Sequence, residues 1–137
     1  MSEGLLIYTQ TLGTFVVYFL ASLALLAVYL VIYTWITPHR EWALIREGNV
    51  AAAISLAGAG LGMVIPLAST IAHSLNLRDM VIWGSVAMIV QLLTFLGARL
   101  LLPQLSRDIA EGRPAGAVAL AALSVSVGVL NAASMTY

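Results

Sequence analysis

The sequence carries one motif twice, and each copy opens a long apolar run. Residues 45–49 are Ile-Arg-Glu-Gly-Asn, and residues 109–113, which lie 64 positions later, are Ile-Ala-Glu-Gly-Arg. The Ala- and Gly-rich stretches that follow the two copies are related by the same offset. A second apolar run, which ends in Pro38 or Pro103, precedes each copy. About 20 apolar residues suffice for a helix to cross a bilayer. The duplication therefore predicts an all-α membrane protein, with four transmembrane helices in two helical hairpins (about 12–72 and 80–136) that form one domain, 1–137.

The composition excludes several other classes of protein. Hydrophobic residues make up 61% of the chain and charged residues 9%, whereas about 25% of the residues in a soluble domain are charged. Six arginines balance six acids and lysine is absent, so no basic patch is available to bind nucleic acid. Cysteine is also absent, which excludes disulfides and thiolate metal sites. The lipid bilayer is therefore the first predicted partner.

Charges and prolines bound the four predicted spans. The first lies within 4–38, and the others cover about 49–72, 80–102 and 115–136. Five of the six arginines lie in or beside the loops 38–48 and 103–114, and only Arg78 lies between the second and third spans. The excess of arginine predicts that both loops are cytoplasmic and that both termini lie outside. The two hairpins then share one orientation, which predicts a parallel repeat about an axis normal to the membrane.

Small residues predict how the spans pack, because lipid supplies no hydrophobic drive between helices. One face of the second span carries Ser55, Gly58 and Gly62, and the last two form a GxxxG pair. The repeat offset carries this face into the fourth span, where it includes Ala122 and Ser126. The fourth span has a second small face, made of Ala117, Ala121, Ser124, Gly128 and Asn131. We therefore expect a four-helix bundle with the second and fourth spans inside, and further assembly into a homo-oligomer or with a membrane partner.

Three polar side chains within the spans are candidates for a polar path or for partner contacts. Arg99 is a candidate because a charge at membrane depth is costly. Alternatively, its long stem reaches the interface, since Pro103 follows only four residues later. Gln91 and Asn131 either line the same path or bond across helices, which contributes about 0.6–2 kcal/mol.

Glu47 and Glu111 form the one acidic pair that the duplication preserves. Each carboxylate precedes a glycine at the predicted start of a span. There it stabilises the positive end of the following helix by about 0.3–1 kcal/mol. The alternative is a symmetric acidic ring on the cytoplasmic face, which would bind a cation or a basic partner.

The sequence offers no recognisable catalytic arrangement. The predicted spans contain no carboxylate pair for acid–base chemistry, and no Ser/His/Asp set, nucleotide loop or pair of haem ligands is credible. His39 and His73 fall on opposite sides of the predicted membrane, so they cannot share a metal. We therefore predict that the protein is not an enzyme and has no cofactor or metal.

The Glu-Gly-Asn and Glu-Gly-Arg copies at 47–49 and 111–113, the proline-terminated spans and the small size resemble the YjfL-like family. This family comprises small bacterial inner-membrane proteins classed as domain of unknown function 350, and the resemblance covers nearly the whole chain. It implies a bacterial plasma-membrane protein with four spans, and it supplies no substrate or catalytic residue. Asn49 against Arg113 departs from a perfect repeat.

Two functions remain open. The first is a structural or accessory subunit that assembles through the small-residue faces. The second is an oligomeric channel or transporter subunit for a small solute or ion, with Gln91, Thr94, Arg99 and Asn131 along the path. Proton-coupled transport usually places acids or histidines within spans, and none is found there, which favours the first. The loop charges contact a cytoplasmic partner or are merely solvated: Arg40, Glu41, Arg46, Arg107 and Asp108.

Overall fold

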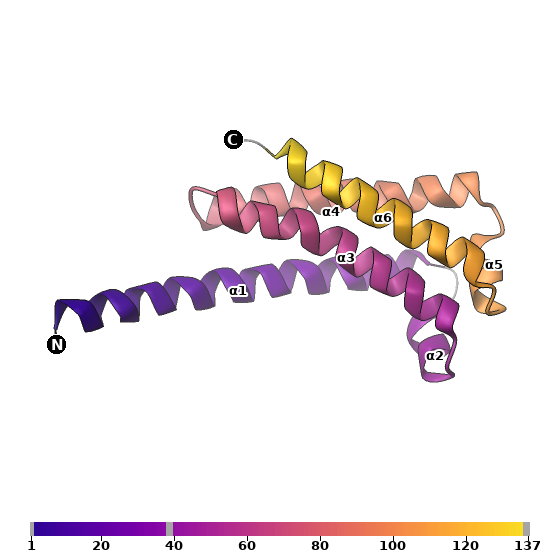
Figure 1. Cartoon of the computed structure of the whole chain (residues 1–137), viewed down its shortest axis with the longest axis horizontal. Helices are drawn as coiled ribbons and strands as arrows, with labels where there is room; N and C mark the ends of the chain where they lie inside the picture. Colours follow the sequence, from indigo (N-terminus) through magenta and orange to yellow (C-terminus); the bar gives the residue numbers. More distant parts are fainter. Residues whose placement is uncertain (1, 38–39, 136–137) are drawn as a thin grey trace.

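The computed structural model describes residues 2–37 and 40–135, and these residues form six α-helices and no strand. Four helices are long and apolar enough to cross a membrane: α1 (Glu3–Ile36), α3 (Val50–His73), α4 (Leu77–Leu101) and α6 (Pro114–Ser134). The chain runs out along α1 and α4 and returns along α3 and α6, so both termini lie at one end of the bundle (Figure 1). The predicted all-α membrane architecture with four spans is confirmed. The predicted end of the fourth span at 136 falls outside the described residues.

The two loops expected between spans contain short helices, α2 (Glu41–Arg46) and α5 (Leu105–Ala110). Both lie at the end of the bundle opposite the termini, which we call the α2–α5 end (Figure 1). Their bounds differ by the 64 positions of the sequence repeat. Each short helix ends at a glycine with positive φ, 86° at Gly48 and 80° at Gly112. Each glycine amide donates to a carbonyl three residues back, at 3.0 Å in both copies.

These turns change the interpretation of the acidic pair. Glu47 and Glu111 are the C-caps of α2 and α5, and they do not occupy the first turn of the following span. The duplicated motif therefore specifies a corner, in which a short helix stops at a left-handed glycine and a span begins two residues later. The parallel relation of the two whole hairpins stays a prediction.

The most extensive helix contact joins α3 to α6, which run side by side in the same direction. Their backbones approach closely at Gly62 and Gly128. A Cβ atom added to Gly128 would lie 3.0 Å from the Gly62 Cα atom, and one added to Gly62 would lie 2.6 Å from the Ser124 carbonyl oxygen. The two helices can cross at this depth because neither glycine has a side chain.

The contact uses the second small face of α6, where Ala117, Ser124 and Gly128 are buried. Ala122 and Ser126 are exposed on this chain. The helical period of 3.6 residues places the two faces on opposite sides of α6. The expectation that the second and fourth spans both lie inside holds for α3, which contacts α1, α4 and α6. It does not hold for α6, which leaves one side open.

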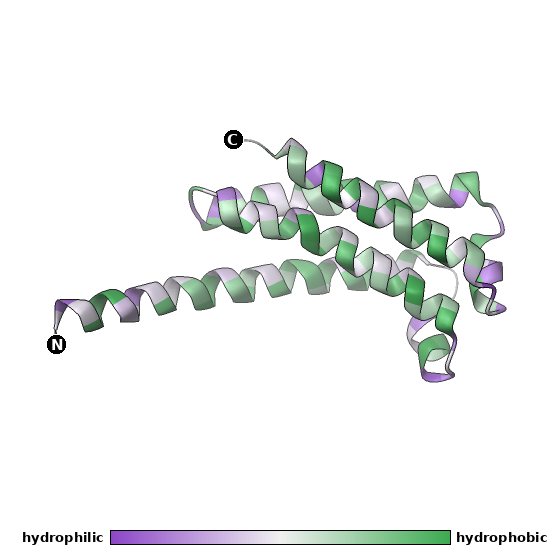
Figure 2. Cartoon of the chain, viewed as in Figure 1, coloured by the Kyte–Doolittle hydropathy of each residue, from purple (hydrophilic) through white to green (hydrophobic). Residues whose placement is uncertain are grey.

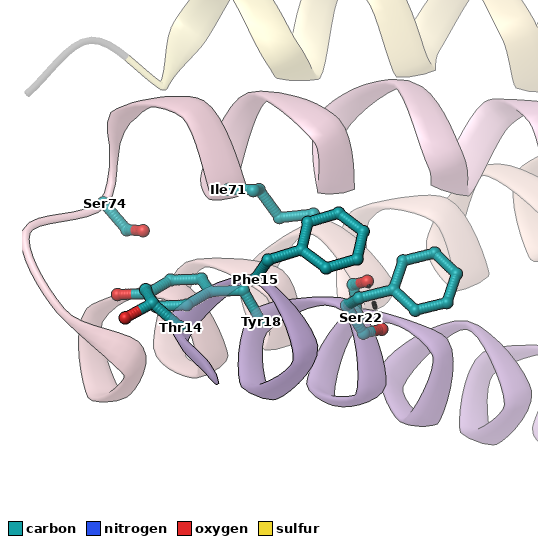
Figure 3. A pocket seen from close by; sticks show the side chains of 7 residues that line it. Thr14, Phe15, Tyr18, Ser22, Ile71 and Ser74 are labelled. Carbon is teal, nitrogen blue, oxygen red and sulfur yellow. Dashed lines mark hydrogen bonds between the residues drawn. The ribbon is translucent and has the colours of Figure 1, made fainter. Parts of the chain in front are cut away.

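Helix α1 has 34 residues and is therefore about 50 Å long, longer than the hydrocarbon core of a bilayer, about 30 Å. It contacts α3 and α4 near the α2–α5 end and diverges from them toward its N-terminus (Figure 1). The divergence leaves an open apolar groove of about 430 Å³ between α1 and the end of α3 (Figure 3). Apolar residues cover the outer sides of the spans, and hydrophilic residues gather at the ends (Figure 2). Such surfaces contact lipid.

Candidate functional site: a buried carboxylate at the α2–α5 end

Glu41, the first residue of α2, is buried with only 2% of its surface exposed. Its Oε1 atom accepts hydrogen bonds from the Tyr33 hydroxyl at 3.0 Å and the Ser55 hydroxyl at 3.1 Å. Tyr33 belongs to α1 and Ser55 to α3, so one carboxylate oxygen joins three helices. The prediction that Glu41 is a solvated or partner-contacting loop charge is wrong, because α2 folds back against the spans and carries this side chain inward.

Aromatic rings surround this carboxylate on the side of α1. Tyr29 and Tyr33 are four residues apart and therefore share a face of α1, with ring centroids 6.2 Å apart. The Tyr33 ring meets the Phe95 ring of α4 edge to face at 5.0 Å. Both tyrosines and Phe95 are 1% exposed. Water is thus excluded from the inner side of the carboxylate, which strengthens its hydrogen bonds.

The first residue of α5 offers a direct comparison. Leu105 lies 64 positions after Glu41, and it is also 2% exposed. Both short helices then bury or half-bury the isoleucine four residues later, Ile45 or Ile109. The two corners therefore place the same position inward, with a carboxylate in the first copy and an apolar side chain in the second.

Arg99 lies at the same end of the bundle. Its Nη1 atom donates to the Ile36 carbonyl oxygen at 3.3 Å, and its guanidinium lies 5.9 Å from the centroid of the Phe95 ring. Ile36 is the last residue of α1, so its carbonyl has no partner within the helix. Arg99 therefore caps α1 and places a positive charge at the negative end of that helix.

Gln91 and Asn131 join α4 and α6 farther along the bundle. The buried Gln91 donates from Nε2 to the Ser124 carbonyl oxygen at 3.0 Å. The half-buried Asn131 donates from Nδ2 to the Ala87 carbonyl oxygen at 3.5 Å. Both amides thus bond across helices to backbone carbonyls. The Gln91 Oε1 atom has no hydrogen-bond partner among the described residues.

The structure does not show the acidic pair as a joint site. Glu111 is exposed and makes ion pairs with Arg107 at 3.3 Å and Arg113 at 3.5 Å. Glu47 is also exposed, and none of the ion pairs within 2–37 and 40–135 involves it. No group of three or more potential metal ligands forms in these ranges either.

Comparison of the sequence with known proteins identifies its family. The family model described as Domain of Unknown Function (DUF350) matches residues 6–135. The chain belongs to this family. It is 39% identical over 128 residues to the UPF0719 inner membrane protein YjfL of Escherichia coli strain K12, covering 93% of this chain and 97% of that protein. It is 24% identical over 111 residues to the UPF0719 transmembrane protein YshE of Bacillus subtilis strain 168, covering 81% and 83%. No solved structure matches.

Membership in the DUF350 family agrees with the four apolar helices. The protein is a multi-pass protein of the bacterial inner membrane, in contact with the lipid bilayer. Its family is uncharacterised and has no assigned enzymatic activity.

Sequence reasoning missed Glu41 although a signal for it was present. The duplicated motif begins at Ile45 and Ile109. Four residues earlier, the same offset pairs Glu41 with Leu105, and an apolar partner at that spacing indicates an inward position. The contact with Tyr33 could not be predicted in this way, because it depends on how α2 turns back against α1.

Proposed function

We propose that the protein is a non-enzymatic structural or accessory subunit of the inner membrane, which assembles with a second copy or with a membrane partner. The exposed small face of α6 carries this proposal. The face includes Ala122 and Ser126, and it is left open because α3 occupies the opposite face. Small residues let helix backbones approach closely in lipid. The α3–α6 contact is an example of such packing within the chain.

We also propose that the α2–α5 end is cytoplasmic. Both arginine-flanked corners lie at this end, and both termini lie at the other (Figure 1). Arginine-rich short loops usually remain in the cytoplasm. A partner that binds the exposed arginines of both corners would then approach from the cytoplasm.

The assembly proposal is tested by an Ala122→Leu, Ser126→Leu double variant, analysed by native mass spectrometry and by cross-linking in membranes. We expect the wild-type oligomer or complex to dissociate, because two leucines prevent close approach on this face. The control is Ala57→Leu, which makes one of these two changes, alanine to leucine, at an exposed alanine of α3. An assembly that survives the double variant would contradict the proposal. Gly62 is unsuitable for this test, because it is buried inside the chain.

A second candidate function is an oligomeric channel or transporter subunit for a small solute or ion. The burial of Glu41 favours it, because proton-coupled transport uses carboxylates that are shielded from water. Gln91 and Arg99 would contribute to the path. Reconstituted protein should then show flux that Gln91→Leu or Arg99→Ala alters. Flux that both variants leave unchanged would reject this path.

A further inference from the structure

Arg99 lies at the depth of the membrane where the hydrocarbon core ends. Ile89 is the middle residue of α4, and Arg99 follows it by ten residues, which corresponds to about 15 Å along the helix. The hydrocarbon core of a bilayer is about 30 Å thick, and the lipid headgroups lie immediately outside it. With α4 centred in the bilayer, Arg99 is therefore at the level where a side chain can reach a lipid phosphate.

The protein satisfies only part of the Arg99 guanidinium. The bond to the Ile36 carbonyl oxygen uses one N–H group, whereas a guanidinium has five such donors in a planar fork. The Phe95 ring, with its centroid 5.9 Å away, covers one side without accepting a proton in a strong bond. None of the ion pairs within residues 2–37 and 40–135 involves Arg99. The positive charge therefore has no acidic partner in the part of the chain that the structure describes.

An open pocket of about 400 Å³ lies beside this guanidinium, and its lining consists of Leu96, Arg99, Leu100 and Pro103. Leu96 and Leu100 are 42% and 84% exposed. Exposed leucines on a membrane-spanning helix contact acyl chains, since lipid is the solvent there. The pocket thus places an apolar surface and an unpaired positive charge side by side. A phospholipid carries the two complementary features, which are an acyl chain and a negative phosphate.

We propose that Arg99 binds the phosphate group of an anionic phospholipid, in the leaflet at the α2–α5 end. Two N–H groups of a guanidinium can donate to two oxygens of one phosphate, which a planar fork favours. The acyl chains of the same lipid then cover Leu96 and Leu100. A free phosphate ion would leave both leucines uncovered, and a zwitterionic lipid would bring a second positive charge to the pocket. This inference goes beyond the assembly proposal and does not depend on it.

Native mass spectrometry in mild detergent tests the proposal, with phosphatidylglycerol and phosphatidylcholine of the same acyl chains as probes. We expect phosphatidylglycerol to bind at least about fivefold more tightly. Arg99→Gln should abolish this preference, and Arg46→Gln, which removes an exposed arginine at the same end, should keep it. No preference in the wild type, or an equal loss in both variants, would overturn the proposal. Displacement of the lipid by inorganic phosphate at the same concentration would overturn the assignment to a lipid.

A second pair of variants leaves Arg99 and its bond to the Ile36 carbonyl oxygen in place. Leu100→Glu puts a carboxylate beside the guanidinium, at a position that is 84% exposed and makes few packing contacts. This carboxylate should compete with the lipid phosphate and abolish the preference for phosphatidylglycerol. Leu100→Gln has the same size without the charge, and it should keep the preference. A preference that persists in Leu100→Glu, or that is lost equally in Leu100→Gln, would contradict a phosphate at Arg99.

Discussion

Substitution of Gly62 by alanine should destabilise the bundle because it separates three helices at once. The added Cβ atom would lie 2.6 Å from the Ser124 carbonyl oxygen and 2.6 Å from the Gln91 Nε2 atom. Those two atoms are joined by the 3.0 Å hydrogen bond between α4 and α6. Overpacking of this kind costs about 1–3 kcal/mol, and an interhelical bond within a membrane contributes about 0.6 kcal/mol. We therefore expect a loss of about 2–4 kcal/mol in the free energy of unfolding.

Gly60→Ala provides the matched control. Gly60 lies on the same helix, and a Cβ atom there meets nothing within 4 Å. Alanine should be neutral or stabilise the helix by up to about 1 kcal/mol at this position. Equilibrium unfolding of both variants in mild detergent measures the difference. Equal stabilities for Gly62→Ala and Gly60→Ala would refute the close approach of α3, α4 and α6 at this depth.

Three further predictions concern the α2–α5 end. Asn49→Ala should cost about 1–2 kcal/mol in an unfolding titration, because it removes the N-cap of α3 at 2.9 Å and the bond to the Ile109 carbonyl oxygen at 2.8 Å. Gly112→Ala should cost about 1–2 kcal/mol, because its φ of 80° is unfavourable for a side chain, and thermal unfolding measures this. Arg99→Met should cost about 1–3 kcal/mol through the loss of the bond to the Ile36 carbonyl oxygen, and it should increase hydrogen exchange in the last turn of α1. An unchanged stability contradicts the corresponding hydrogen bonds for Asn49→Ala and Arg99→Met, and the positive φ for Gly112→Ala.

The number and extent of the spans could be predicted from the sequence, because length, charge and proline determine where a helix can cross a bilayer. The GxxxG pair at Gly58 and Gly62 was also identified as a packing face, and both glycines are buried. The face of α6 that meets α3 could not be selected, because Ala122 and Ala121 are equally small. Only the relative rotation of α3 and α6 decides between them, and a single sequence does not encode that rotation locally.

The hydrogen bonds of Glu41 could not be predicted from the sequence for a related reason. Tyr33 and Ser55 are distributed over two spans, and neither residue type indicates a site by itself. They become a site when the corner at Gly48 turns α2 back and carries Glu41 between them. The duplication indicates that position 41 faces inward, since it pairs Glu41 with an apolar residue. It does not indicate which residues Glu41 contacts.

Helix α2 folds back and buries position 41 at the α2–α5 end of the bundle, which we propose to be cytoplasmic. The chain has no cysteine, so single variants Glu41→Cys and Glu47→Cys can be labelled with a membrane-impermeant maleimide in inside-out vesicles. We predict rapid labelling at position 47, and labelling at position 41 only after denaturation. Equal labelling of the two positions in the folded protein would contradict the claim.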